Sequence, residues 1–145
     1  MEVRPLTSAD AEAISTWRYR GRYSTYDIGE IVTPAQGYWA VTHEGELVGR
    51  CSFGAEARVP GVDEEEGTLD IGYGMRPDLV GQGMGRAFVT AILDFGVQEF
   101  SPQRLRVLVL NWNERSRKVA DALGFETKET VSRAEGDFVV MTRPA

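Results

Sequence analysis

The chain has 145 residues, which corresponds to one domain, residues 1–145, with a single core. Its 42% hydrophobic and 26% charged residues exclude collagenous, low-complexity and largely disordered proteins. A net charge of −6 argues against a nucleic-acid-binding face and slightly favours a small cationic partner. Because no apolar run approaches the roughly 20 residues of a membrane span and no secretory leader follows Met1, we expect a cytoplasmic protein without a membrane partner.

The chain has a single cysteine, Cys51, and a single histidine, His43. Together they make neither an internal disulfide nor a Cys/His zinc set, so we expect no metal. A hydrolase with a Ser-His or Cys-His pair would require Cys51 or a serine to meet His43 in the fold. The strand pattern instead assigns Cys51 to the core and His43 to a turn.

The first half of the chain reads as strands with one helix and a polar, aromatic stretch. A helix is predicted from the capping box Thr7-Ser8-Ala9-Asp10 to about Tyr19, and residues 18–36 support a short second helix and a loop. The predicted strands cover residues 3–6, 38–42 and 47–53. Gly45 gives the turn between the last two of these strands its positive φ. Residues 54–67 read as an acidic, solvated loop.

The second half alternates between strands and helices. Residues 68–75 form a predicted strand with Leu69, Ile71, Tyr73 and Met75 on one face and Asp70, Gly72 and Gly74 on the other. A helix follows, with a predicted buried stripe at Met84, Phe88, Ala91, Ile92 and Phe95. Residues 105–110 form a strand parallel to the first, because a long helix connects them. A helix from Asn113 to Leu123, capped by Gly124, then precedes a hairpin of residues 125–131 and 137–142.

The turn Gly81-Gln82-Gly83-Met84-Gly85 joins a strand to a helix. Its glycines allow close approach of a ligand, and the helix dipole adds positive potential, so a phosphate or pyrophosphate is the natural ligand. Arg86 breaks the dinucleotide fingerprint, and the Gly-Lys-Ser/Thr of a phosphate-binding loop is missing. The alternative is a turn that only packs the helix on the sheet.

These residues resemble the GCN5-related N-acetyltransferases (GNAT), whose signature is Arg/Gln-x-x-Gly-x-Gly/Ala. Residues 80–86 correspond to that signature, and Asn113-x-x-Ser116 followed by Gly124-Phe125 resembles a later family segment. The start at residues 3–7 is also similar, so the resemblance covers nearly the whole chain. Residues 70–73 look most like the branch that includes ribosomal-protein N-terminal acetyltransferases. The resemblance implies an α+β fold, with a mixed, mostly antiparallel sheet of six to seven strands, a splayed parallel central pair and about four flanking helices.

The resemblance also implies a function, the transfer of acetyl from acetyl-CoA to a primary amine of a small molecule or a protein N-terminus. Transfer would be direct and sequential, because the sequence shows no positioned nucleophile. The backbone N–H of Met75 would polarise the thioester carbonyl, and the side chain of Asn113 would contact the pantetheine arm, although Asn113 is also a good helix cap. The implied cofactor-binding turn consists of Gly81, Gln82, Gly83, Met84, Gly85 and Arg86.

Two departures affect the implied chemistry. Val80 stands where the signature has Arg or Gln, and Ala120 stands where many members carry a Tyr acid, which makes Ser116 the candidate acid. Asp70, beside two glycines on its strand face, is the candidate base, with Glu66 and Glu46 as alternatives. Asp70 and Ser116 also have plain interpretations as surface residues.

The acceptor site is least defined by the sequence. Tyr23, Tyr26 and Tyr38 are the candidate substrate residues, because aromatic faces hold cations and the family's first helices line its acceptor cleft. A protein N-terminus, a lysine, a polyamine, an aminoglycoside and an amino acid all remain open, as does a homodimer. Val80 and Ala120 also suit a second hypothesis, a non-catalytic acyl-CoA-binding or sensing module. A third hypothesis, an unrelated nucleotide-binding domain, is disfavoured by the failed fingerprints.

Overall fold

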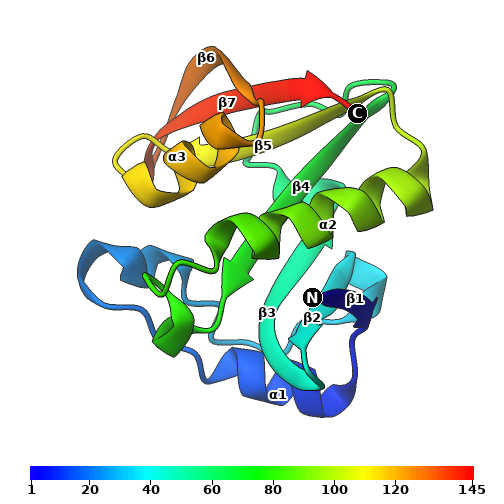
Figure 1. Cartoon of the computed structure of the whole chain (residues 1–145). Coiled ribbons are helices and arrows are strands. Elements are labelled where there is room, and N and C mark those ends of the chain that lie inside the picture. The colour runs from blue at the N-terminus through cyan, green and yellow to red at the C-terminus, as the bar shows by residue number, and fades with distance from the viewer.

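Seven strands form one mixed sheet in the order β1-β2-β3-β4-β5-β7-β6 (Figure 1). The computed structural model describes all residues, 1–145. The strands are β1 (Glu2–Pro5), β2 (Tyr38–His43), β3 (Glu46–Phe53), β4 (Thr68–Met75), β5 (Arg104–Leu110), β6 (Glu126–Arg133) and β7 (Gly136–Pro144). The α-helices are α1 (Ser8–Ser15), α2 (Gly85–Phe100) and α3 (Glu114–Ala122), and the short 3-10 helices are η1 (Gly21–Tyr26), η2 (Pro34–Gln36), η3 (Ala55–Ala57) and η4 (Pro77–Leu79). The predicted α+β architecture is confirmed, with η1 as the short second helix.

The central strands β4 and β5 are parallel, as expected, and every other pair of neighbouring strands is antiparallel. The pairing of β4 with β5 covers only residues 68–70 of β4 and 104–106 of β5. Beyond Asp70 and Arg106 the two strands diverge, so each loses its neighbour on that side (Figure 1). The predicted splay of the central pair is therefore present and opens the middle of the sheet.

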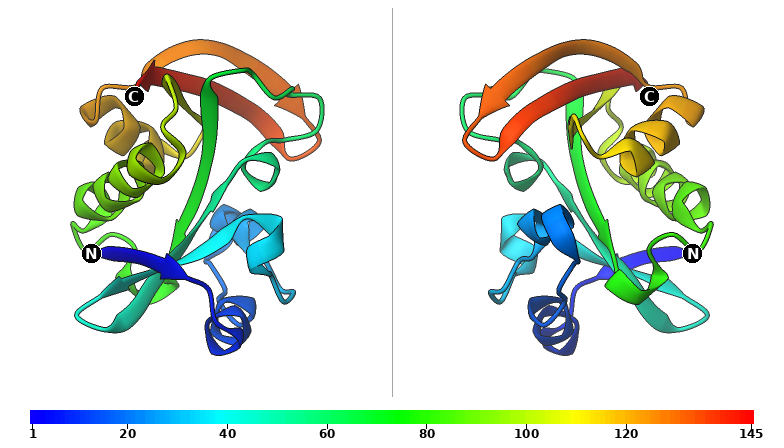
Figure 2. Two further views of the ribbon diagram at one scale, coloured as in Figure 1. Left: turned by 90° about the vertical axis from the view of Figure 1, so that its right-hand side faces the viewer. Right: turned by 90° about the vertical axis from the view of Figure 1, so that its left-hand side faces the viewer.

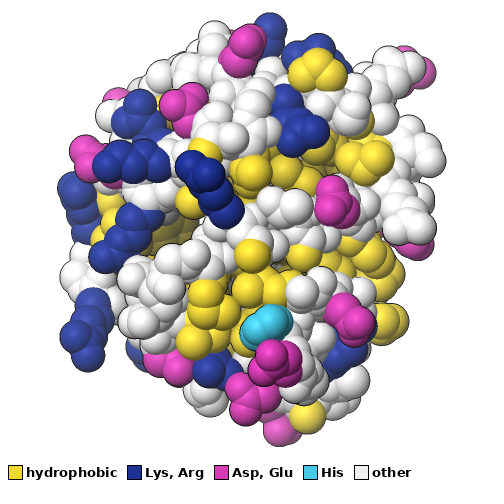
Figure 3. Space-filling view, viewed as in Figure 1, with side chains coloured by type: hydrophobic (Ala, Val, Ile, Leu, Met, Phe, Trp, Pro, Cys, Tyr) yellow, Lys and Arg dark blue, Asp and Glu magenta, His cyan; other side chains and the backbone are white.

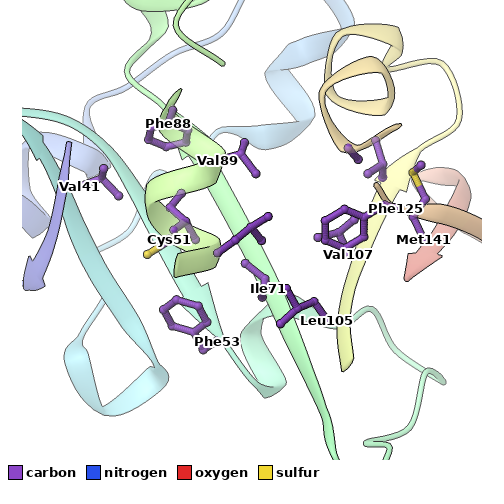
Figure 4. Packing of buried hydrophobic residues seen from close by; sticks show 14 of the residues in the cluster. Val41, Cys51, Phe53, Ile71, Phe88, Val89, Leu105, Val107, Phe125 and Met141 are labelled. Carbon is purple, nitrogen blue, oxygen red and sulfur yellow. The ribbon is translucent and has the colours of Figure 1, made fainter. Parts of the chain in front are cut away.

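The hydrophobic core lies between the sheet and α2. Figure 4 shows Cys51, Phe53 and Ile71 of the sheet beside Phe88 and Val89 of α2. Together, α2 and α3 lie on one side of the sheet, and η1 to η3 lie on the other (Figure 2). A smaller cluster of buried side chains lies around α1 and consists of Leu6, Ala11, Ile14, Val32, Tyr38 and Ala40. None of the helices is both long and apolar enough to cross a membrane.

Two predicted details differ from the structure. Helix α1 ends at Ser15 instead of near Tyr19. The Tyr19 N–H donates to a carboxylate oxygen of Asp27 (2.8 Å) and its hydroxyl donates to the Met75 carbonyl (2.5 Å), so Tyr19 is held outside the helix. The buried face of α2 is also rotated from the predicted stripe, because the helix packs on α3 as well as on the sheet. Its buried residues are Phe88, Val89, Ile92, Leu93 and Gly96, whereas Met84, Ala91 and Phe95 are only partly buried.

Candidate functional site

The divergence of β4 and β5 leaves a cleft of about 930 Å³. Residues 71–75 of β4 form one wall and residues 107–109 of β5 form the other. Residues of η1, η4, the glycine turn and the first turns of α2 and α3 complete the lining. More than half of the lining residues are hydrophobic, and the volume lies in the range of small-molecule and cofactor sites.

The glycine turn lies where α2 begins. Gly81 and Gly83 have φ values of +80° and +82°, the left-handed conformation that glycine adopts without strain. Helix α2 has no side-chain cap, and its first helical hydrogen bond runs from the Phe88 N–H to the Met84 carbonyl (3.0 Å). The N–H groups of the first turn therefore have no acceptor within the helix, which makes this end suitable for a phosphate.

The predicted cofactor residues divide into two groups. Met75, Gly81, Gln82, Gly85 and Asn113 line the cleft. Gly83, Met84 and Arg86 belong to the same turn, but they do not line the cleft in this structure. Because Val80 lines the cleft where the family signature carries Arg or Gln, that position supplies no side-chain hydrogen-bond donor and binding there depends on backbone N–H groups.

Asn113 begins α3 and also connects it to η1. Its side-chain oxygen accepts from the Ser116 N–H (3.3 Å), so the predicted helix cap is present. Its amide Nδ2 donates to the Tyr26 hydroxyl (2.9 Å), and burial raises the pKa of that phenol. This hydrogen bond joins the α3 side of the cleft to the η1 side.

Ser116 and Tyr73 lie together inside the cleft. The Tyr73 hydroxyl is 3.5 Å from the Ser116 Oγ, and its ring packs edge-on against Phe88. Burial raises the pKa of the Tyr73 phenol, so this group is protonated near neutral pH. The sequence pattern indicated Ser116 as a site residue but placed Tyr73 only on a strand face, although Tyr73 lies two residues before Met75.

The mouth of the cleft is aromatic and basic. Tyr23 packs edge-on against Trp112 with ring centroids 5.0 Å apart. The guanidinium of Arg22 lies 4.5 Å from the Trp112 ring centroid, and that of Arg115 lies 5.3 Å from the Tyr23 ring centroid. Figure 3 shows Lys and Arg side chains gathered around α3 and η1, beside a hydrophobic hollow. A chain with a net charge of −6 thus presents a local positive surface where an anionic ligand would enter.

The surroundings of Asp70 count against the predicted role of general base. The Asp70 side chain is buried and does not line the cleft. It accepts hydrogen bonds from Arg106 (2.6 and 3.1 Å) and from Arg58 (2.9 Å). Both carboxylate oxygens are therefore occupied by guanidinium donors. The space that Gly72 appeared to leave beside it is filled, since a Cβ at Gly72 would meet the Ser52 Oγ at 2.8 Å.

The remaining predicted residues lie in several places. Of the candidate substrate residues, Tyr23 and Tyr26 line the cleft, whereas Tyr38 packs with the cluster around α1. The alternative bases Glu46 and Glu66 are exposed and do not line the cleft. Cys51 is in the core, where burial raises the pKa of its thiol to about 12, so it is not a thiolate nucleophile near neutral pH. His43 ends β2 at the hairpin turn, and no group of three or more potential metal-ligating side chains comes together.

Solved structures share this fold. The aminoglycoside acetyltransferase AAC(6')-Ib in complex with coenzyme A has a TM-score of 0.78 and 21% identity, over 99% of this chain and 94% of that chain. RimJ from Mycobacterium smegmatis has a TM-score of 0.70 and 19% identity, covering 99% and 81% of the two chains. Ribosomal-protein-S5-alanine acetyltransferase from Vibrio fischeri has a TM-score of 0.67 and 19% identity, covering 98% and 91%. At sequence identities of 19–21%, the structural similarity establishes a shared fold.

Sequence comparison gives the family. No curated protein is significantly similar to this chain. Residues 1–126 match the family described as acetyltransferase (GNAT) domain, which covers the β4-α2-β5 unit, the glycine turn and α3. The chain belongs to the GNAT acetyltransferase family.

Proposed function

We propose that this acetyltransferase moves the acetyl group of acetyl-CoA to a primary amine by direct attack. The observation that carries the proposal is the uncapped start of α2, whose glycine turn opens into the cleft between β4 and β5. The N–H groups of that turn would bind the pyrophosphate, and the mostly apolar cleft would hold the pantetheine arm. AAC(6')-Ib, which has the same fold, is described in complex with coenzyme A.

We infer direct transfer because the chain offers no activated nucleophile for an acetyl-enzyme intermediate. The neutral amine nitrogen forms a bond to the thioester carbonyl carbon and gives up one proton to solvent. The C–S bond breaks, and the sulfur leaves as a thiolate that takes a proton. An enzyme-bound acetyl intermediate would require an activated side chain. Cys51 is buried with a raised pKa, and the only histidine, His43, lies at the hairpin turn. No acyl intermediate is therefore expected.

The proton for the sulfur would come from the pair Tyr73 and Ser116. Ala120 occupies the place of the family's usual tyrosine, and it is buried in the core. Tyr73 supplies a phenol from β4 instead, in hydrogen-bonding range of Ser116 at 3.5 Å. Because burial raises the pKa of Tyr73, the phenol remains neutral and can donate to the leaving sulfur.

Tyr73→Phe is expected to raise the apparent pKa of the enzyme-bound coenzyme A thiol by about one. A phenol that donates a hydrogen bond stabilises the thiolate, and Phe cannot replace that bond. The measurement is the ultraviolet absorbance of the thiolate in the complex as a function of pH. Ser116→Ala should give a smaller shift in the same direction. Desulfo-coenzyme A, which has no thiol, is the control, and its affinity should be the same for the wild type and for Tyr73→Phe. An unchanged thiol pKa in Tyr73→Phe would show that Tyr73 does not stabilise the thiolate.

The proposed function is tested by calorimetric titration with acetyl-CoA and ATP, followed by an assay of thiol release with amines. We expect micromolar binding of acetyl-CoA, weak binding of ATP and release of thiol with at least one amine class. The amines include aminoglycosides and peptide N-termini, in view of the names of AAC(6')-Ib and the ribosomal-protein acetyltransferase. Binding without turnover for every amine would favour the non-catalytic acyl-CoA module, and no binding would reject the cofactor site.

A further inference from the structure

Arg50 lies beside the thioester end of the cleft, on the sheet face opposite α2. It is directly across from Gly74 in the β3–β4 pairing. Its guanidinium covers Gly74 so closely that a Cβ there would meet the guanidinium atoms at 3.1–3.2 Å. Gly74 and Met75 line the cleft, whereas Arg50 itself does not. A cation is therefore one strand away from the backbone proposed to hold the reacting carbonyl.

The Arg50 guanidinium makes no hydrogen bond and no ion pair within the protein. Its nitrogen atoms remain accessible to solvent, because the structure has no buried side-chain nitrogen without a partner. In contrast, Arg58 and Arg106 both pair with Asp70. A partly buried guanidinium with unused donors is suited to an external anion.

No carboxylate forms an ion pair with Arg50, and Glu56 and Asp27 instead accept hydrogen bonds from tyrosines. Glu56 accepts a hydrogen bond from the Tyr38 hydroxyl (3.4 Å), and Asp27 accepts from the Tyr19 N–H (2.8 Å). The Tyr38 ring lies under Arg50, with the guanidinium carbon 5.9 Å from the ring centroid. Tyr38 thus helps to fix the Arg50 side chain without using its donors.

We propose that the acceptor amine carries a carboxylate and that Arg50 binds this carboxylate. The inference rests on the proposed acetyl transfer and narrows its acceptor to amino acids and related amino-carboxylates. The planar guanidinium fits a carboxylate with two parallel hydrogen bonds. A polycation such as an aminoglycoside would place positive charge against Arg50, which is unfavourable. Arg50 is therefore expected to make this chain prefer a different acceptor from the aminoglycoside enzymes with the same fold.

The test compares free amino acids with their C-terminal carboxamides in the thiol-release assay. The wild-type protein should prefer the acid by about 10- to 100-fold in kcat/KM, since only the acid pairs with Arg50. Arg50→Gln should abolish the preference through loss of activity on the acid, with the activity on the amide little changed. Lys128→Gln is the control, because it removes the same charge from an exposed position on β6 and should retain the preference.

Two results would overturn the inference. One is equal or better use of carboxamides, or of kanamycin, by the wild-type protein, and the other is an acid preference that Arg50→Gln retains. A second measurement distinguishes failure of this inference from failure of the proposed function. Calorimetry measures the binding of N-acetylated amino acids, and of their amides, to the protein with coenzyme A bound. Arg50-dependent binding of the acid without turnover would support the carboxylate site and count against catalysis, whereas no selective binding and no turnover would reject both.

Discussion

Gly83→Asp is expected to weaken coenzyme A binding by about 100-fold while the chain remains folded. The turn at Gly83 leads into the uncapped N-terminus of α2, where the free N–H groups would meet the pyrophosphate. A carboxylate at this position competes for those groups and repels the phosphates. Hydrogen bonds to charged groups contribute about 1.5–3 kcal/mol each, so the loss of one or two accounts for this factor. Calorimetric titration measures the change directly.

Gly45→Asp is the matched control for this substitution. Gly45 has φ +80° and Gly83 has φ +82°, and a Cβ at either position would meet no atom within 4 Å. Both variants therefore carry the same left-handed backbone strain, about 1–2 kcal/mol, and the same added charge. Gly45 lies in the β2–β3 turn, whereas Gly83 lies just before the N-terminus of α2. If both variants bind coenzyme A equally well, the glycine turn does not form the phosphate site.

Local patterns predicted most of the fold because the groups that define each element are close together in sequence. The Thr7–Asp10 capping box forms as expected, with the Asp10 N–H donating to the Thr7 hydroxyl at 3.1 Å and the Thr7 N–H donating to Asp10 at 2.8 Å. Arg4 also binds Asp10 and, as the main cause, lowers the pKa of that carboxyl to about 2. Gly124 takes the left-handed conformation after α3, with φ +89°. Each of these features depends on residues within a few positions.

The residues of the candidate site were harder to predict because their environment comes from distant segments. The faces of β4 were correctly predicted, but alternation alone does not say what covers a face. Asp70 meets Arg106 from 36 residues further along the chain, and the two strands were predicted to be parallel but without a register that pairs these residues. Tyr73 gains its place in the cleft because β4 and β5 separate after Asp70. Sequence periodicity contains no signal for the point of separation.

Asp70→Asn is expected to destabilise the fold by about 3–5 kcal/mol, which corresponds to a fall in Tm of roughly 10 °C. The Asp70 side chain is buried between Arg58 and Arg106, with relative exposure of only 1% for the residue. An amide keeps the shape but removes the counter-charge of Arg58 and the closer counter-charge of Arg106, which keeps only the exposed Glu65 at 3.6 Å. Urea unfolding measures the loss. Asp78→Asn is the control, because it breaks an exposed pair with Arg76 and should have little effect.

The same variant separates a structural role of Asp70 from a catalytic one. Asp70 and Arg106 are the last paired residues before β4 and β5 diverge, so their ion pair holds the two strands together at the base of the cleft. In a double-mutant cycle, Arg106→Gln should cost less stability in the Asp70→Asn background than in the wild type, because the closest partner charge of Arg106 is already missing there. Below the unfolding transition, the folded variant should keep kcat within about tenfold of wild type, since general-base loss typically costs 10²–10⁴-fold. A much larger fall in kcat at full stability would restore Asp70 as the base and would require an open conformation of its two arginine partners.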